Sequence, residues 1–196
     1  MSELLYQGTV TIIRRYQGRF LSRQVLKNNG ENPLFLILCN FLGGKSVAPE
    51  DQPNYLDIIG YPNEGEAGVE SLLYSPVQIS SSESWVDAGS SSQSPSLTKV
   101  FNLNYLNIRS PQKEYKRVYL VLRDESRKDS EGKPVQGKIM ARVPIVDESG
   151  NYLDQYPIGQ DESHEIYWKM SFANARSTSV IYTATEQEKK EETAGE

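Results

Sequence analysis

The chain contains one histidine, His164, and acidic residues stand on both sides of it. Histidine is the usual acid or base at neutral pH, and a carboxylate from Asp161, Glu162 or Glu165 could orient its imidazole. A catalytic triad also needs a nucleophile, and the sequence assigns none. We therefore interpret His164 as a solvated residue at the entrance of a strand, and we predict no catalytic residue and no enzymatic activity.

The acidic residues between 147 and 165 offer two other kinds of chemistry. Two carboxylates on either side of a sugar could hydrolyse a glycosidic bond. The segment from Asp147 to Asn151 has the oxygen ligands that calcium prefers, but not the spacing of a calcium-binding loop. Because these acids lie in turn-like stretches, turn formation alone explains them. The sequence therefore predicts no metal site and no cofactor.

The segment Gly43-Gly44-Lys45-Ser46 ends like a phosphate-binding loop. It lacks the upstream glycine, since Cys39 occupies that position, and it follows a predicted helix where a phosphate-binding loop would open one. We interpret the two glycines as the end of a helix. The chain has a single cysteine, which excludes an intrachain disulfide and a zinc site built from cysteines.

Basic and aromatic residues gather around the first predicted turn, where Tyr16 and Phe20 stand among four arginines. This cluster could contact phosphate or an acidic partner, although we favour a solvated hairpin face. The serine-rich segment 80–96 carries Trp85 and Val86 at its centre, which we predict to dock on another surface. The predicted interaction residues are Arg14, Arg15, Tyr16, Arg19, Trp85 and Val86.

These candidates depend on strands to position them. Alternation of apolar and polar residues predicts a hairpin over 4–16 and 19–27 that turns at Gln17 and Gly18. Further strands are predicted over 55–61, 72–79, 97–108, 118–122, 137–145 and 165–172, with a short piece at 180–182. Phe101, Leu103 and Tyr105 are predicted to share one face. The pattern indicates a mainly β protein, an antiparallel β-sandwich or a partly closed barrel.

One short helix is predicted near residues 33–43. Asn32 can cap it, Pro33 suits its first position, and Gly43 or Gly44 can end it in the left-handed conformation. The helix is apolar on nearly all sides, which predicts that it is buried under the strands. The residues that define it are Asn32, Pro33, Phe35, Leu38, Phe41 and Gly43.

The chain has 196 residues, a length typical of one domain. We predict a single β-rich domain over 1–184 with long loops at 45–70, 80–96 and 123–136. The charged segment 185–196 is predicted to be a disordered tail. A net charge of -5 argues against a general nucleic-acid binder. No signal-like or bilayer-spanning segment is visible, so we expect a soluble protein from a reducing compartment, without membrane contact.

The opening part of the chain resembles a known class of proteins. A hairpin is followed by Asn-Asn-Gly-Glu-Asn-Pro and then by Leu-Phe-Leu-Ile-Leu-Cys-Asn-Phe-Leu-Gly-Gly. Over residues 6–45 this is similar to the N-terminal part of small accessory virion proteins of tailed bacteriophages. The resemblance implies a non-enzymatic structural protein of the head or tail, which decorates the capsid or attaches tail or fibre parts. It also implies assembly in the host cytoplasm, with other virion proteins and further copies of the chain as partners.

Two other functions stay open. Tyrosines on polar strand faces could stack on sugar rings, as in a carbohydrate-binding module on a host-recognition structure. They could equally anchor a protein interface. The other function is that of a glycoside hydrolase that uses the acids between 147 and 165. It requires two of these carboxylates in one pocket.

Overall fold

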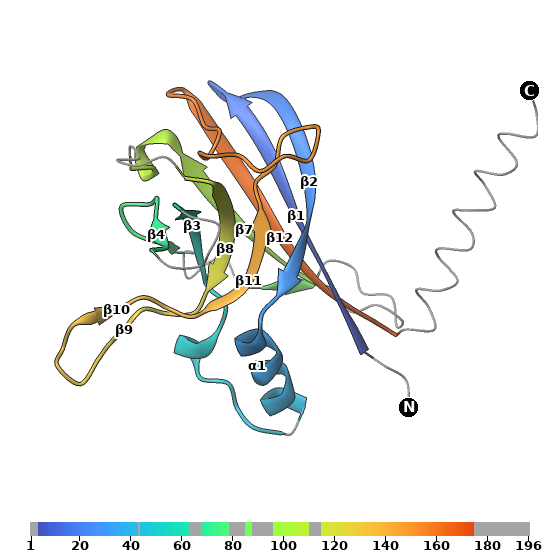
Figure 1. The fold of residues 1–196 in the computed structure, drawn as a ribbon. Coiled ribbons are helices and arrows are strands. Elements are labelled where there is room, and N and C mark those ends of the chain that lie inside the picture. Colours follow the sequence, from blue (N-terminus) through green and yellow to red (C-terminus); the bar gives the residue numbers. More distant parts are fainter. Residues whose placement is uncertain are drawn as a thin grey trace, which may run out of the picture.

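The computed structural model describes residues 4–42, 44–62, 68–78, 85–87, 96–109 and 115–174 (Figure 1). In this part the chain is mainly β, as predicted, with one α-helix and two short 3-10 helices, η1 (Pro49–Asp51) and η2 (Tyr105–Asn107). The strands are β1 (Leu4–Tyr16), β2 (Arg19–Gly30), β3 (Tyr55–Tyr61), β4 (Glu70–Ser71), β5 (Val77–Gln78), β6 (Val86–Asp87), β7 (Ser96–Asn104), β8 (Arg117–Arg123), β9 (Arg127–Lys128), β10 (Pro134–Val135), β11 (Ile139–Pro144) and β12 (Glu162–Asn174).

A 10-stranded antiparallel sheet forms the body of the molecule, in the order β4-β3-β8-β11-β2-β1-β12-β7-β6, with β5 also paired to β3. β9 and β10 form a separate ribbon that projects from the body (Figure 1). At the junction of β2 and β11 only two residue pairs are in register, Gly30 with Ala141 and Asn29 with Arg142. Beyond this junction the two strands diverge, so that the two halves of the sheet face each other as in a sandwich.

The two halves share one hydrophobic core. Trp168 of β12 and Phe101 of β7 are fully buried in the same cluster as Leu120 of β8 and Ile58 of β3. The outer edges of the halves also meet, because Leu73 and Ile108 form an isolated β-bridge. The described strands do not close into a barrel. The predicted sandwich-like β fold is therefore confirmed.

The first hairpin has the predicted strands and the predicted turn. Gln17 and Gly18 have φ values of 46° and 79°, the combination found in the tight turns that suit the twist of two paired strands. Inward positions of β1 such as Val10 and Ile12 are buried. A β-bulge interrupts the pairing between Arg14 and Arg15, near the turn. Local alternation and turn residues therefore determine this hairpin.

The helix α1 (Asn32–Leu42) ends as predicted but begins one residue earlier. Gly44 has a φ of 74°, and the Lys45 amide donates to the Asn40 carbonyl at 2.9 Å, which is the closing bond of a Schellman motif. At the start of the helix, the Glu31 carbonyl accepts from the amides of Leu34 and Phe35. Glu31 is therefore the cap residue in place of Asn32, and Pro33 takes the second helical position instead of the first.

The prediction that this helix is buried on all sides is wrong. Leu34 is buried and Ile37 packs against the core, but Phe35 is exposed and Leu36 is 62% exposed. The reason is its place at one end of the sheet, beside the ends of β2 and β11, where only one face of a helix can be covered (Figure 1). Gly43 and the side chains of Asn32, Leu38 and Phe41 lie outside the described residues.

Other differences concern the ends of strands and the predicted loops. Tyr105 leaves the face it was predicted to share with Phe101, because the chain turns into η2 there and exposes it. The predicted strand 72–79 is replaced by the short β4 and β5 on either side of a bend. Within the predicted loop 45–70, the strand predicted over 55–61 is present as the buried β3, so this prediction is confirmed. The predicted loop 123–136 contains the whole β9–β10 ribbon. Most of 80–96, and the whole of 180–182 and 185–196, lie outside the described residues.

Candidate functional site

Side chains that could do chemistry meet at three places. Two of them lie on the outer face of β3, β8 and β11, where alternate residues point away from the core. The register of β3 and β8 pairs Tyr55 with Arg123 near one end and Tyr61 with Arg117 at the other. Between these ends a small apolar cluster contains Ile59 and Val121. The third place is the inner face where β1 and β12 meet near the first turn.

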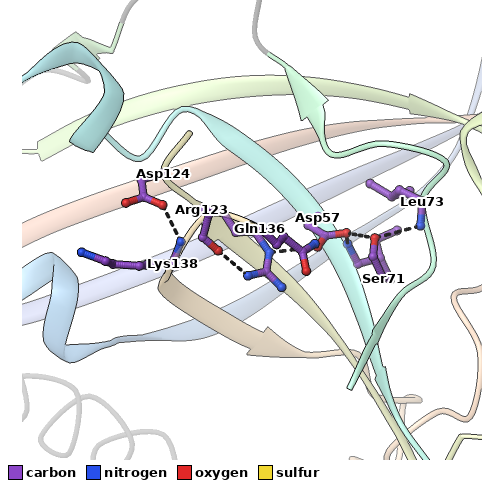
Figure 2. A network of polar contacts seen from close by, with 9 residues as sticks. Asp57, Ser71, Leu73, Arg123, Asp124, Gln136 and Lys138 are labelled. Atoms are coloured by element: carbon purple, nitrogen blue, oxygen red, sulfur yellow. Dashed lines mark hydrogen bonds and ion pairs between the residues drawn. The ribbon is translucent and has the colours of Figure 1, made fainter. Parts of the chain in front are cut away.

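The first cluster is built around Asp57 of β3, which is completely buried (Figure 2). Its Oδ1 accepts hydrogen bonds from the Ile58 amide at 2.8 Å and from the Ser71 hydroxyl at 2.5 Å. Its Oδ2 accepts from Arg123 Nε at 2.9 Å and from Gln136 Nε2 at 2.6 Å. Since four donors occupy the carboxylate, it serves to hold three segments of chain together and is a poor candidate for a catalytic base.

Asp124, the residue that follows β8, has a different environment. Asp124 accepts a hydrogen bond from the Lys138 amide on Oδ1, whereas its buried Oδ2 receives none and lies 3.7 Å from the Arg127 guanidinium. Burial raises the pKa of the Asp124 carboxyl, and the Lys138 amide and the charge of Arg127 oppose that rise. Asp124 lines a cavity of about 180 Å³ next to α1, together with Asp51 and Lys138. This carboxylate can accept a further hydrogen bond from a small donor.

The third cluster contains His164, which is 1% exposed, so its interpretation as a solvated residue is wrong. The Tyr156 hydroxyl lies 2.9 Å from Nδ1 of His164, and Glu162 lies 3.4 Å from Nε2. Arg14 donates to both oxygens of the same Glu162 at 3.1 and 2.9 Å. Sequence reasoning missed Tyr156 and the link to Arg14, because the latter depends on the pairing of β1 with β12, 148 residues apart.

The electrostatics of this cluster favour a neutral imidazole. Burial lowers the pKa of His164, and the positive charge of Arg14 adds to that effect, while Glu162 opposes it. Burial alone would raise the pKa of Glu162, but hydrogen bonds from Arg14, the Gly159 amide and His164 lower it overall. Burial raises the pKa of the Tyr156 phenol. No serine, threonine or cysteine of the described residues bonds the imidazole, so the cluster has no activated nucleophile.

The predicted basic patch on the first hairpin divides into two parts. Arg14 is directed to the inner face as described above, and Arg15 on the other face donates to Glu165 at 2.7 Å. Tyr16 and Arg19 stay exposed at the turn. Two of the four arginines near the first turn therefore form cross-strand ion pairs. The exposed basic residues that remain belong to β2.

The other predicted interaction residues lie in or next to β6, a terminal strand of the sheet. Trp85 is half-buried and packs against the core, and the Lys99 ammonium lies 5.6 Å from its ring centroid. Val86 pairs with Thr98 in β7, and its side chain is not among those described. The prediction that the centre of the serine-rich segment docks on another surface is confirmed for Trp85, and that surface belongs to the same chain.

The acids considered for hydrolysis or calcium binding are separated. Asp147 accepts hydrogen bonds from the Ser149 and Asn151 amides and from the Asn151 side chain within its own turn, which lower its pKa. Glu162 and Glu165 point to opposite faces of β12 and pair with different arginines. No group of three metal-ligating side chains occurs in the described part of the chain. None of the acids from 147 to 165 lines a cavity described here.

The second place on the outer face is a cavity of about 210 Å³ that sequence reasoning missed. Two arginines and three tyrosines line it: Arg117, Arg142, Tyr61, Tyr119 and Tyr152. The spacing of Arg117 and Tyr119 on a predicted strand could have indicated it, since residues two apart share a face. The continuous apolar run 118–122 concealed this signal.

Comparison with protein-family models, with curated proteins and with solved structures found no match to this chain. Among the residues that the structure describes, no helix combines the length and the hydrophobicity needed to cross a lipid bilayer. The function must therefore be argued from the surfaces and clusters themselves.

Proposed function

We propose that this chain is a non-enzymatic structural protein that acts by protein–protein assembly, as a head- or tail-associated component of a tailed-bacteriophage virion. The observation that carries the assembly part is the open edge of β2. The virion setting comes from the resemblance of residues 6–45 described above. The polar clusters support a structural role, because the Asp57 and Glu162 carboxylates are engaged in contacts that join distant segments.

The open edge runs along most of β2. One side of the strand pairs with β1 from Arg19 to Asn28. On the other side, within the described residues, β11 pairs only with Asn29 and Gly30. The segment after β11 contacts this side through one side-chain hydrogen bond, which Gln24 donates to the Val146 carbonyl at 3.1 Å. A strand edge of this kind can pair with a strand of another chain.

The side chains along this edge suit a protein partner. Phe20, Leu21 and Val25 are 64%, 50% and 55% exposed, and large exposed apolar side chains that lie close together mark interaction surfaces. Arg23 and Lys27 are also exposed and alternate with them on the outer face. Basic residues on an edge oppose pairing with a second basic strand. The favoured partner strand is therefore apolar with acidic residues.

The test is the molar mass across a concentration series, measured by size-exclusion chromatography with light scattering. We expect the mass of the wild-type protein to rise with concentration and the β2 amides to gain protection from hydrogen exchange in the assembled form. Val25→Lys should keep the protein monomeric. Val135→Lys is the matched control, since Val135 is 47% exposed on the separate β10 ribbon. Equal effects of both substitutions would contradict self-assembly through β2, and a monomer at every concentration would leave only other virion proteins as partners of this edge.

A carbohydrate-binding module is the second candidate, because the 210 Å³ cavity has tyrosines on its wall. Tyr152 is exposed at this cavity, and an exposed ring can stack on a sugar. A glycan screen tests it. Binding that is lost in Tyr152→Ala and kept in Tyr74→Ala, a more exposed tyrosine elsewhere, would favour this function over assembly.

A further inference from the structure

We propose that the cavity formed by Tyr61, Arg117, Tyr119, Arg142 and Tyr152 is an oxyanion-binding site, which takes a phosphate, sulfate or carboxylate group. The site lies on the outer face of β8 and β11, on the far side of the junction from the exposed residues of β2. It lies apart from the β2 edge on which the assembly proposed above rests.

Charge is the first argument. Two arginines line the cavity and no acidic residue of the described part of the chain does, although the chain as a whole has a net charge of -5. The Glu31 carboxylate, in the segment between β2 and α1, accepts from Arg142 Nε at 2.6 Å. Arg142 thus already binds one carboxylate at the rim. A cavity lined by two guanidinium groups favours a negatively charged ligand.

The rings fix the arginines in place. The Arg117 guanidinium lies 5.8 Å from the ring centroids of both Tyr61 and Tyr152, and that of Arg142 lies 5.8 Å from Tyr119. The three rings also contact one another, with centroids of Tyr61 and Tyr119 5.3 Å apart and those of Tyr119 and Tyr152 6.0 Å apart. An arginine held over a ring keeps its N–H groups at the edge of its plane, where they can bond two oxygens of one anion.

The tyrosines add polar groups to the positive charge of the cavity. Each of their three ring centroids lies 5.8 Å from a guanidinium group. Burial raises the pKa of the Tyr119 phenol, and its hydrogen bond with Tyr152 adds to that rise. The groups that the cavity offers are therefore mostly hydrogen-bond donors.

Titration with sodium sulfate and with sodium phosphate tests the proposal, at constant ionic strength adjusted with sodium chloride. The readouts are calorimetry and the NMR signals of the arginine Nε–H groups. We expect saturable binding that shifts the Arg117 signal. Arg117→Gln should weaken it by about tenfold or more, the loss of one hydrogen bond to a charged group. Glu31→Gln should strengthen it severalfold, because a competing carboxylate is removed from Arg142.

Arg109→Gln is the matched control. Arg109 also lies over a tyrosine, 5.5 Å from the ring centroid of Tyr74, but outside the cavity. Its substitution should leave the affinity unchanged, and so should Val25→Lys in β2. Arg117→Lys is a variant that keeps the positive charge. Thermal unfolding shows whether each variant is folded. Equal losses in Arg117→Gln and Arg109→Gln, an unchanged affinity in Glu31→Gln, or no saturable binding would overturn the proposal.

The oxyanion can be a free ligand or an acidic side chain of a second copy of the chain. Repeating the light-scattering series at saturating sulfate separates these sources. If a second copy supplies the carboxylate, sulfate lowers the molar mass at a given concentration. If the ligand is a free anion, sulfate binds and the molar mass is unchanged.

Discussion

At the scale of single residues, buried polar groups are the most informative feature of this protein. Asp57 has 0% exposure and His164 has 1%, yet each has hydrogen-bond partners: those of Asp57 come from distant parts of the chain, and those of His164 lie within eight residues of it. A buried polar group is tolerated only when its hydrogen bonds are made, and its removal leaves partners unsatisfied. These two residues therefore allow sharp predictions about stability.

Substitution of Asp57 by alanine should lower the free energy of unfolding by about 3–5 kcal/mol, because Arg123 would keep a buried charge without its carboxylate. Urea unfolding monitored by circular dichroism measures the change. The control is Asp51→Ala, which removes a carboxylate that pairs with Arg127 where both side chains are more than 40% exposed. That substitution should change the free energy by no more than about 1 kcal/mol. Similar losses for the two variants would contradict the structural role of Asp57.

His164 should make stability depend on pH in a defined window. Because burial lowers its pKa in the folded state, the unfolded chain binds a proton first as pH falls. Stability should be constant above about pH 7 and decrease below about pH 6.5, with a slope approaching about 1.4 kcal/mol per pH unit. The raised pKa of Asp124 has the opposite effect on stability, because the folded chain then binds a proton first as pH falls. The lowered pKa of Glu162 reduces stability as pH falls, but at lower pH than His164 does.

The measurement is urea unfolding at several pH values between 5 and 8. His164→Gln removes the only histidine of the chain, so it should abolish the decrease in this window even if it lowers stability at every pH. A wild-type protein whose stability does not change between pH 7 and 5 would show that the imidazole is not held neutral.

At the scale of elements, α1 shows that the position of a helix in the fold decides which of its apolar side chains are buried. Leu34 and Leu36 are two residues apart, but one is 2% exposed and the other 62%. Leu34→Ala should lower the free energy of unfolding by about 2–5 kcal/mol, as for other buried leucines. Leu36→Ala should change it by no more than about 0.5 kcal/mol. Thermal unfolding of the two variants measures this, and equal effects would mean that the helix is covered on both faces.

At the scale of the whole molecule, the two halves of the bent sheet act as one unit. Their core is continuous, Lys99 of β7 donates to Asn54 next to β3 at 2.6 Å, and Leu73 and Ile108 form a bridge between the edges. Neither half has an apolar interior without the other. A structure of this kind unfolds in a single cooperative step.

Unfolding should therefore be a single transition in urea by every probe. The Trp85→Phe variant leaves Trp168 as the only tryptophan, which reports on the buried centre of β12. Its fluorescence should change at the same urea concentration as the far-ultraviolet circular dichroism of the whole chain. Separate midpoints for the two signals would show that the halves of the sheet unfold independently.

Much of the fold was predictable because its signals are local. Alternation identified β1, β2, β7 and β12, the residues Gln17 and Gly18 identified the first turn, and Gly44 identified the end of α1. Each of these features depends on residues that are close in sequence. The candidate site was less predictable: Arg14, Arg15, Tyr16 and Arg19 were identified as a basic patch, but the partners of the first two were not.

By itself, the sequence determined a mainly β protein with one short helix, since period, turn residues and caps act within a few residues. Only the tertiary structure decided which strands are neighbours. That pairing places Glu162 beside Arg14, buries His164, surrounds Asp57 with donors from three segments and aligns Arg117 with Tyr61. It also leaves β2 with an open edge. These features arise from contacts between residues far apart in the chain, which no local pattern specifies.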